Sequence, residues 1–520
     1  PPWTFPSDPR DAEDYRRGGE FVETFEGQPV KLTPVLGEDT YSRRIQDRVC
    51  DRLAEFDPRT LELRGTLAHA WQQDPEGMWL RVKLRPNVNF SDGEPVTADD
   101  VVYTLMDYIK NPELETESLR SILTRIEKVE KVSERVVEYT FTEPDAYNLQ
   151  NALTFYILPE HFYERFTPKQ INQSTSLVMG SGPFKMRTLD PDNQWSPGED
   201  VVLERNERYW GPKPALARLR FDAINEDNAR LTALTNGETD MIEPSSPQYA
   251  QLHDKTRITD IAYTFDWLNM RSGYSFIGWQ CGERNGRLTP FHDRRVRLAM
   301  THNLDRQRMI DDIWEGIGTI ATGPNNPPSP AANPDIEPWP YDPERARELL
   351  AEAGWVDRDD DGVRENDEGD EFEYQFTYPA GSQVIERVAK YVKDRSAAVG
   401  IRMTQRAVDW SKYDQLLKTR DFDAITLAWA KSAPESDPTQ IWHTDAIENQ
   451  GHNFIQWRHP RQDPLIEAIR AERDFEKRME RFHEFHALVH QEQPYTFVRV
   501  SPWLRFISRE FRNVHTYEKG

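Results

Sequence analysis

Cysteine is scarce in this sequence, and long apolar runs are missing. Cys50 and Cys281 are the only cysteines in 520 residues, which excludes a disulfide scaffold and a cysteine-rich metal cluster. One disulfide between them is an alternative, but two buried thiols are the preferred interpretation. No run of about 18 apolar residues occurs, and a transmembrane helix needs such a run. The sequence therefore predicts no segment that spans a bilayer.

Positive charge is also in short supply. The chain has 65 Lys and Arg against 89 Asp and Glu, a formal net charge of −24. This balance argues against a nucleic-acid partner, because phosphate binding needs a basic face that releases counterions. An acidic surface instead keeps a protein in solution. The length of 520 residues predicts about three domains, since one domain usually holds ~100–200 residues.

Common catalytic motifs are missing as well. The sequence contains no G-x-S-x-G nucleophile elbow and no P-loop. The glycine-rich turn Gly180-Ser181-Gly182 lacks the third glycine and the following helix of a dinucleotide site. A secreted carbohydrate-active hydrolase that uses paired carboxylates is kept as an alternative, because acidic, Trp-rich chains are typical of such enzymes. With 89 acidic residues, however, pairs of carboxylates carry little information.

A strand, a turn and a helix are predicted between residues 77 and 111. From Trp79 to Arg85, apolar residues alternate with Arg and Lys, the pattern of a strand with one buried face. Ser91-Asp92-Gly93 supplies a turn, and Thr97 with Asp100 forms a capping pair at the start of a helix.

The same stretch carries a family resemblance. Residues 84–105 read LRPNVNFSDGEPVTADDVVYTL. This run closely resembles the signature of the family 5 extracellular solute-binding proteins, the peptide, dipeptide and nickel receptors of bacterial ABC importers. Two further stretches, 206–243 and 290 to about 355, resemble the same family, and looser similarity continues toward the C-terminus. The resemblance therefore covers nearly the whole chain.

The second of these stretches predicts a βαβ unit. A strand at Leu219–Ile224 precedes a helix near Ala229–Leu234, which is closed by Gly237, and a buried strand follows at Thr239–Ile242. Parallel pairing of the two strands with a right-handed crossover is expected.

The resemblance implies an α/β fold of the periplasmic-binding-protein type, with two lobes, a hinge and a ligand cleft between the lobes. Residues 1–45, 180–265 and 495–520 would form the main domain of the first lobe. Residues 46–179 would form a small additional domain of that lobe, and residues 266–494 the second lobe.

The resemblance also implies a function without catalysis. The protein would capture a peptide or other small solute in the cleft and deliver it to the permease subunits of an ABC importer, as a monomer with no required cofactor. Its place would be the periplasmic or extracellular face of the cell membrane, with a signal or lipoprotein leader removed and a lipid anchor as an option. A sensor or scaffold of the same fold that acts without a transporter is a further alternative.

The resemblance also points to residues of the cleft. In peptide-binding members, a Trp is followed three residues later by an Asp that pairs with the α-amino group of the ligand. The corresponding residues here are Trp429 and Ser432, so the acid is replaced, and Asp437 is the alternative partner for an ammonium group. An unpaired buried charge is costly, so this replacement weakens the expectation of peptide binding. The other residues expected at the cleft are Glu38, Tyr41, Trp267, Asn269, Trp410, Trp442 and Asn453.

An acidic loop matches a calcium-binding pattern. Residues 357–368 read DRDDDGVRENDE, which fits D-x-D-x-D-G-x5-E. The predicted ligands are the side chains of Asp357, Asp359, Asp361 and Glu368 and the carbonyl of Val363. A strand is expected after the loop instead of a helix, which excludes a regular EF-hand, so the ion would be structural. An acidic turn that binds nothing is an equal alternative.

Three histidines lie on one face of a predicted helix. His483, His486 and His490 are spaced i, i+3 and i+7, and two histidines four residues apart can hold zinc. The spacing of HEFH is not that of the HExxH metalloproteases. A partly solvated helix face is therefore preferred to a zinc site.

Overall fold

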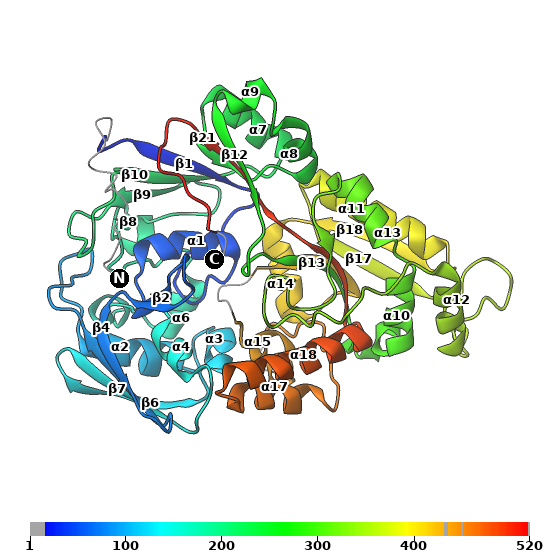
Figure 1. Cartoon of the computed structure of the whole chain (residues 1–520), viewed down its shortest axis with the longest axis horizontal. Helices are drawn as coiled ribbons and strands as arrows, with labels where there is room; N and C mark the ends of the chain where they lie inside the picture. The colour runs from blue at the N-terminus through cyan, green and yellow to red at the C-terminus, as the bar shows by residue number, and fades with distance from the viewer. Residues whose placement is uncertain (1–15, 431–434, 449–450, 518–520) are drawn as a thin grey trace.

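Three large β-sheets organise the chain (Figure 1). The computed structural model describes residues 16–430, 435–448 and 451–517. The first sheet has seven strands in the order β12 (Ala262–Trp267), β21 (Trp503–Ser508), β11 (Met241–Ile242), β1 (Glu20–Phe25), β10 (Arg218–Ala223), β9 (Val201–Arg205) and β8 (Phe184–Met186). It therefore joins strands from the two ends and the middle of the sequence.

The other two large sheets are each made from one stretch of the chain. The six-stranded sheet has the order β16 (Thr319–Ile320), β20 (Tyr495–Val500), β13 (Tyr274–Trp279), β19 (Ala424–Trp429), β17 (Glu373–Pro379) and β18 (Arg402–Val408). The four-stranded antiparallel sheet has the order β4 (Ala68–Gln73), β5 (Trp79–Leu84), β7 (Val136–Phe141) and β6 (Ile126–Ser133). A short hairpin of β2 (Ala54–Phe56) and β3 (Leu63–Gly65) lies beside them.

Helices cover these sheets. The principal helices are α1 (Thr40–Val49), α2 (Ala98–Val102), α3 (Glu117–Ile122), α4 (Asn148–Leu153), α7 (Asp227–Asn236), α10 (Arg294–His302), α11 (Arg306–Trp314), α12 (Pro343–Glu352), α13 (Gln383–Ala397), α14 (Trp410–Thr419), α15 (Thr439–Trp442), α17 (Gln462–Ala471) and α18 (Phe475–Glu492). Helices α10 to α13 pack with the six-stranded sheet in one apolar cluster. None of the helices in the described ranges is both long and apolar enough to cross a membrane.

The structure is two-lobed, as predicted. Figure 1 shows the seven-stranded and four-stranded sheets on one side of the molecule and the six-stranded sheet on the other. The core of the first side runs continuously from the main sheet into the small domain, because Phe25, Val82 and Phe221 belong to one buried cluster. The second side has its own cluster around the six-stranded sheet, as expected of a separate body, and a further cluster there also includes Tyr147 of the small domain.

The strand, turn and capped helix predicted between 77 and 111 are confirmed. The strand β5 alternates buried and solvent-facing residues, and the carboxylate of Asp100 accepts hydrogen bonds from the backbone N–H of Thr97 at 2.8 Å and from its hydroxyl at 3.0 Å. After α2 the helix continues as a π-helical segment, Tyr103–Ile109. The whole unit belongs to the small domain.

The βαβ unit differs from the prediction in one respect. The strands β10 and β11 do run parallel, and Gly237 closes α7 with a left-handed φ of 73°. The two strands are not neighbours, however, because β1 lies between them and pairs with both. The N-terminal strand β1 therefore lies between the two strands of the βαβ unit.

The C-terminal helical region lies between residues 462 and 492. The chain forms two helices there, α17 and α18, which pack against each other. Asp474 separates them by accepting a hydrogen bond from the backbone N–H of Lys477 at 3.1 Å, as an N-cap does.

The chain passes between the seven-stranded and six-stranded sheets at two places that lie side by side. The first crossing, residues 268–273, joins β12 to β13, and the second, residues 501–502, joins β20 to β21. The crossings are in contact, because the backbone N–H of Ser501 donates to the carbonyl of Gly273 at 3.0 Å. We call these residues the hinge.

The two crossings lie close to the predicted domain boundaries but not at them. The first crossing lies just beyond the boundary drawn at 265/266. In the C-terminal part, β20 still pairs within the six-stranded sheet, so the return to the first sheet follows Val500 and not residue 494. The segment 495–517 thus gives one strand to each sheet.

Both cysteines are free thiols. Cys50 is buried and Cys281 is half-buried, so the preferred interpretation of two thiols holds, with Cys281 less enclosed than expected.

Candidate functional site

A cavity of about 760 Å³ opens between the small domain and the second lobe. Helices α1, α3 and α4 and the hairpin β2–β3 supply most of its lining, while Arg271 of the hinge, Gln440 of α15 and Tyr517 near the C-terminus close it from the other side. Figure 1 shows the C-terminal end of the chain beside α1 and β2. The volume lies within the ~300–1,000 Å³ usual for small-molecule sites.

Arginine dominates the charged lining of this cavity. Five arginines line it, namely Arg43, Arg48, Arg52, Arg64 and Arg271, and three carboxylates, Glu38, Asp47 and Glu55. The lining therefore carries two more positive than negative charges, in a protein whose net charge is −24. Of these eight residues, only Glu38 was predicted from the sequence.

Two of the carboxylates are held by neighbouring arginines. Asp47 lies 2.5 Å from Arg52 and accepts a hydrogen bond of 2.6 Å from the hydroxyl of Tyr156. Burial alone would raise the pKa of the Asp47 carboxyl, but Arg52 and the Tyr156 hydroxyl outweigh it, so the pKa lies below its usual value. Glu55 lies 2.5 Å from Arg64.

The third carboxylate connects the two lobes. Glu38 precedes α1, and its Oε2 lies 3.1 Å from Nε2 of His452 in the second lobe. Its other oxygen accepts a hydrogen bond from the hydroxyl of Ser118 on α3. Burial would raise the pKa of Glu38, yet the contact with His452 lowers it below the usual value. Glu38 is therefore an ionised group that the second lobe contacts directly.

Trp429 stands next to this contact. It is the last residue of β19, its ring stacks on that of His452 with centroids 5.4 Å apart, and it also stacks on Phe454 at 5.8 Å. Trp429, Asp437 and Trp442 also line a second, smaller cavity of about 60 Å³. Trp429 therefore lies at the junction of the lobes, within reach of the hinge, since it pairs in register with Tyr274, the first residue of β13.

Asp437, the alternative partner for a ligand ammonium group, already faces a cation. Its carboxylate is 3.7 Å from Nε of Arg470, and its other oxygen accepts from the backbone N–H of Thr439 at 2.9 Å. Ser432 lies outside the described residues.

The remaining predicted cleft residues fall into two groups. Tyr41 and Trp410 meet edge to face across the lobes, with ring centroids 6.4 Å apart. The other four lie in the hinge or the core. Trp267 stacks on Trp503 in the seven-stranded sheet, Asn269 is buried in the hinge and donates to the carbonyl of Tyr517 at 3.3 Å, and Trp442 and Asn453 are buried in the second lobe.

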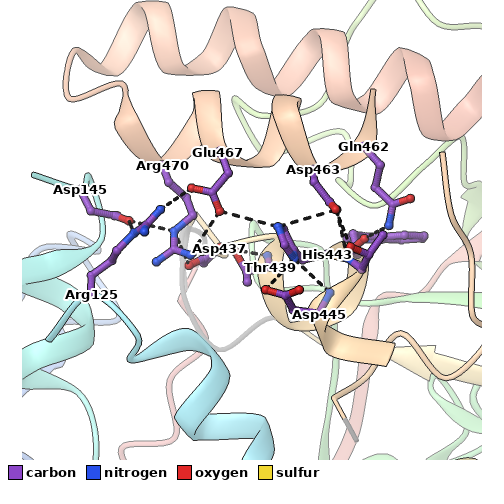
Figure 2. Close-up of polar contacts among 12 residues, drawn as sticks. Arg125, Asp145, Asp437, Thr439, His443, Asp445, Gln462, Asp463, Glu467 and Arg470 are labelled. Atoms are coloured by element: carbon purple, nitrogen blue, oxygen red, sulfur yellow. Dashed lines mark hydrogen bonds and ion pairs between the residues drawn. The ribbon is translucent and has the colours of Figure 1, made fainter. Parts of the chain in front are cut away.

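A network of charged side chains joins the small domain to α15 and α17 of the second lobe (Figure 2). Arg125 and Asp145 come from the small domain, and Glu467 and Arg470 come from α17. Arg470 Nε lies 2.8 Å from the Asp145 carboxylate, and Arg125 pairs with Glu467. Figure 2 shows His443 on the far side of Glu467, where it lies 3.7 Å from both Glu467 and Asp463. Tyr147 adds a 3.1 Å hydrogen bond to Glu435.

The acidic loop gathers a slightly different set of carboxylates from the predicted one. Oxygens of Asp357, Asp359, Asp361 and Glu365 all lie within 4.8 Å of one another. Glu365 is buried and takes the place expected for Glu368, because the bridge between Val356 and Glu365 brings Glu365 beside Asp357. The backbone N–H of Glu368 instead joins a turn by donating to Asn366 at 3.0 Å.

The three histidines of α18 do not lie on a solvated helix face. His486 and His490 are buried, and they contact the proline-rich segment that follows β16. His490 Nδ1 lies 2.9 Å from the carbonyl of Thr322, and His486 Nδ1 accepts from the backbone N–H of Asn333 at 3.1 Å. His483 Nε2 lies 3.0 Å from the carbonyl of Pro330. Each imidazole therefore has a structural partner in this segment.

The family model described as "Bacterial extracellular solute-binding proteins, family 5 Middle" matches residues 62–449. The oligopeptide-binding protein AppA of Bacillus subtilis is 27% identical over 495 residues, which cover 93% of this chain and 86% of that protein.

Solved structures share the fold. The complex of Bacillus subtilis AppA with a nonapeptide superposes with a TM-score of 0.88 at 24% identity, over 97% of each chain. The ABC transporter-associated periplasmic binding protein DppA from Helicobacter pylori, in complex with the peptide STSA, gives a TM-score of 0.85 at 20% identity, over 98% of this chain and 97% of that one.

Proposed function

Because this chain belongs to family 5 of the bacterial extracellular solute-binding proteins, we propose that it captures a small solute between its lobes and delivers it to the permease of an ABC importer. The observation that carries the proposal is the 760 Å³ cavity, whose lining comes from the small domain, the hinge and the second lobe. A site lined by both lobes becomes complete only when the lobes close on each other.

Contacts between the lobes support closure as the binding event. A ligand that touches both lobes favours the closed arrangement only by the contacts it makes in that arrangement alone. The lobes also contact each other directly, through Glu38 with His452 and Tyr41 with Trp410. These contacts would likewise belong to the closed arrangement. The hinge offers two short crossings about which the lobes can rotate. The permease would then recognise the closed form.

We also propose that the protein binds its ligand without altering it chemically. The hydrolase alternative requires two carboxylates free to act as acid and base. In the cavity, Glu38, Asp47 and Glu55 are each engaged by a neighbouring side chain. A receptor returns its ligand intact at one molecule per protein, whereas a hydrolase releases products.

Native mass spectrometry of protein purified from its source tests this function. We expect a single co-purified small molecule, bound once and recovered unaltered after denaturation. Release of cleaved fragments would contradict the proposal. Uptake of the same solute should also stop when the permease is deleted, and retained uptake would favour a sensor or scaffold that acts without a transporter.

Several further features belong to the proposal. The protein would act as a monomer outside the cytoplasmic membrane, with a lipid anchor at its N-terminal end as one means of retention. Trp429 would form part of the ligand site. Asp357, Asp359, Asp361, the carbonyl of Val363 and Glu365 would hold a structural calcium ion, since carboxylate and carbonyl oxygens are the ligands this ion prefers. None of these residues lines the 760 Å³ cavity, so the ion would stabilise the fold and not contact the ligand.

A further inference from the structure

Two arginines of α1, Arg43 and Arg48, line the 760 Å³ cavity and, in the part of the chain that the structure describes, have only longer-range charge interactions, with Glu38 and Asp47 respectively. Among the described residues, the guanidinium groups of Arg43 and Arg48 form no ion pair within 4.0 Å and no hydrogen bond. Both are exposed to the space of the cavity. A guanidinium presents five N–H donors and keeps its charge at any pH a cell experiences. These two groups therefore stand ready to bind acceptors that the protein does not supply.

The carboxylates of the cavity are, by contrast, all engaged. Glu38 faces His452 and Ser118, Asp47 faces Arg52 and Tyr156, and Glu55 faces Arg64. An ammonium group of a ligand would have to displace one of these partners. The second cavity offers no better site, since its Asp437 already lies 3.7 Å from Arg470.

The hinge adds a third cation to the same space. Arg271 lines the same cavity as Arg43 and Arg48. Burial lowers the pKa of the Arg271 guanidinium. The charge of Asp47 raises this pKa, and the charge of Arg52 lowers it further.

Resting on the proposed function, we infer that the solute is a small polyanion with at least two carboxylate-type groups, held by Arg43 and Arg48 and accompanied by Arg271 in the same lining. Planar carboxylates fit the fork of a guanidinium with two parallel hydrogen bonds. The ligand needs no free ammonium group. Both an acidic peptide and a non-peptide polycarboxylate carry this chemistry.

Isothermal titration calorimetry with five defined probes tests the inference. The acidic peptide Ala-Glu-Glu and its N-acetylated form separate the role of the ammonium group from that of the carboxylates. The neutral N-acetyl-Ala-Gln-Gln-amide and the cationic Ala-Lys-Lys-amide have matched length, and citrate represents a non-peptide polycarboxylate. We expect at least one anionic probe to bind ten times more tightly than the neutral and cationic peptides, and N-acetylation to change affinity less than twofold.

Substitutions locate the binding groups. Arg43→Gln and Arg48→Gln should each weaken the preferred anionic probe about tenfold, which corresponds to about 1.4 kcal/mol, and Arg43→Lys should recover part of the loss. Arg187→Gln is the matched control, because Arg187 is 68% exposed and its carboxylate contact, with Glu204, is 3.8 Å long. Since Arg43 and Arg48 form no direct ion pair and no side-chain hydrogen bond among the described residues, their replacement should change the melting temperature little.

The outcomes separate this inference from the function on which it rests. Equal or tighter binding of the neutral or cationic peptide, or a tenfold loss on N-acetylation, would overturn the inference. The inference would also be overturned if no anionic probe bound and the native mass spectrum showed a neutral or cationic ligand. The receptor function would remain intact in that case. Cleavage of a probe would instead overturn the receptor function.

Discussion

Arg470 and Asp145 form a buried ion pair between the lobes. The Nε atom of Arg470 lies 2.8 Å from the Asp145 carboxylate, and their side chains are 3% and 2% exposed. Arg470 sits on α17 of the second lobe and Asp145 in the small domain, so this pair connects the lobes in a region that water barely reaches.

Replacement of Arg470 by Met should therefore destabilise the contact between the lobes. It removes the nearer cation from the buried Asp145 carboxylate and leaves only Arg125, whose Nε lies 3.7 Å away, and removal of one partner from a buried pair typically costs about 3–5 kcal/mol. We expect a larger radius of gyration by small-angle X-ray scattering, since separation of the lobes lets water reach Asp145, and a lower midpoint in urea. The control is Arg345→Met, which removes an exposed pair with Glu348 and should cost less than about 1 kcal/mol. Equal effects of the two substitutions would contradict the assignment of Arg470 to the contact between lobes.

Asp51 should make stability depend on pH. Burial raises the pKa of its carboxyl from 3.8 to about 6, although Trp210 and Ser181 donate hydrogen bonds to it. The folded protein thus binds a proton more tightly than the unfolded chain. Its contribution to stability is complete below pH ~4 and is lost as pH rises to about 6, by at most roughly 3 kcal/mol at ~1.36 kcal/mol per pH unit.

Asp51→Asn should remove this dependence. The amide oxygen can still accept hydrogen bonds from Trp210 and Ser181, but it carries no charge. We expect the free energy of unfolding at pH 7 to rise, and the difference between variant and parent to shrink as pH falls toward 4. A difference that stays constant across this range would show that Asp51 titrates normally.

The acidic loop allows a direct test between two glutamates. The calcium pattern in the sequence ends at Glu368, whereas the structure gathers Glu365 with Asp357, Asp359 and Asp361. If calcium binds as proposed, a concentration of 100 times Kd should stabilise the fold by about 2.7 kcal/mol. Glu365→Gln should reduce the calcium-dependent rise in melting temperature more than Glu368→Gln does. Absence of any shift with calcium or chelator would rule out the site.

Glu38 should be needed for tight closure. Glu38→Gln keeps the size of the side chain but removes the charge that faces His452 at 3.1 Å. Loss of a charge-assisted hydrogen bond that forms between lobes should weaken ligand binding about tenfold and reduce the ligand-induced change in Trp429 fluorescence. Glu94→Gln, at an exposed position in the small domain, serves as the control. Unchanged affinity in Glu38→Gln would mean that this contact does not distinguish closed from open forms.

Local patterns in the sequence predicted local structure well. The alternation from Trp79, the capping pair of Thr97 and Asp100, and Gly237 after α7 are all confirmed, because each depends on residues a few positions apart. The insertion of β1 between β10 and β11 could not be predicted in this way. It depends on pairing between residues about 200 positions apart, which leaves no periodic signal.

The same limit applies to the site. The family resemblance placed Glu38 and Trp429 at the cleft, and the structure puts both at the junction of the lobes. The arginines of the cavity were missed, since Arg43, Arg64 and Arg271 come from separate segments whose charges meet only in the folded chain. The one local signal was the RRIQDR run of α1, which presents Arg43 and Asp47 four residues apart on one face.

The paired crossings at residues 268–273 and 501–502 restrict how the halves can move. Two adjacent tethers, bonded through Ser501 and Gly273, resist twisting and sliding and leave bending as the soft motion. Asn326 adds to this restraint by donating to the carbonyls of Asn269 and Ser272 at 3.0 and 2.6 Å. Pairs of spin labels placed on opposite lobes should therefore all report changes in one bending angle between the lobes. One measured distance between labels would then be enough to define the closing motion.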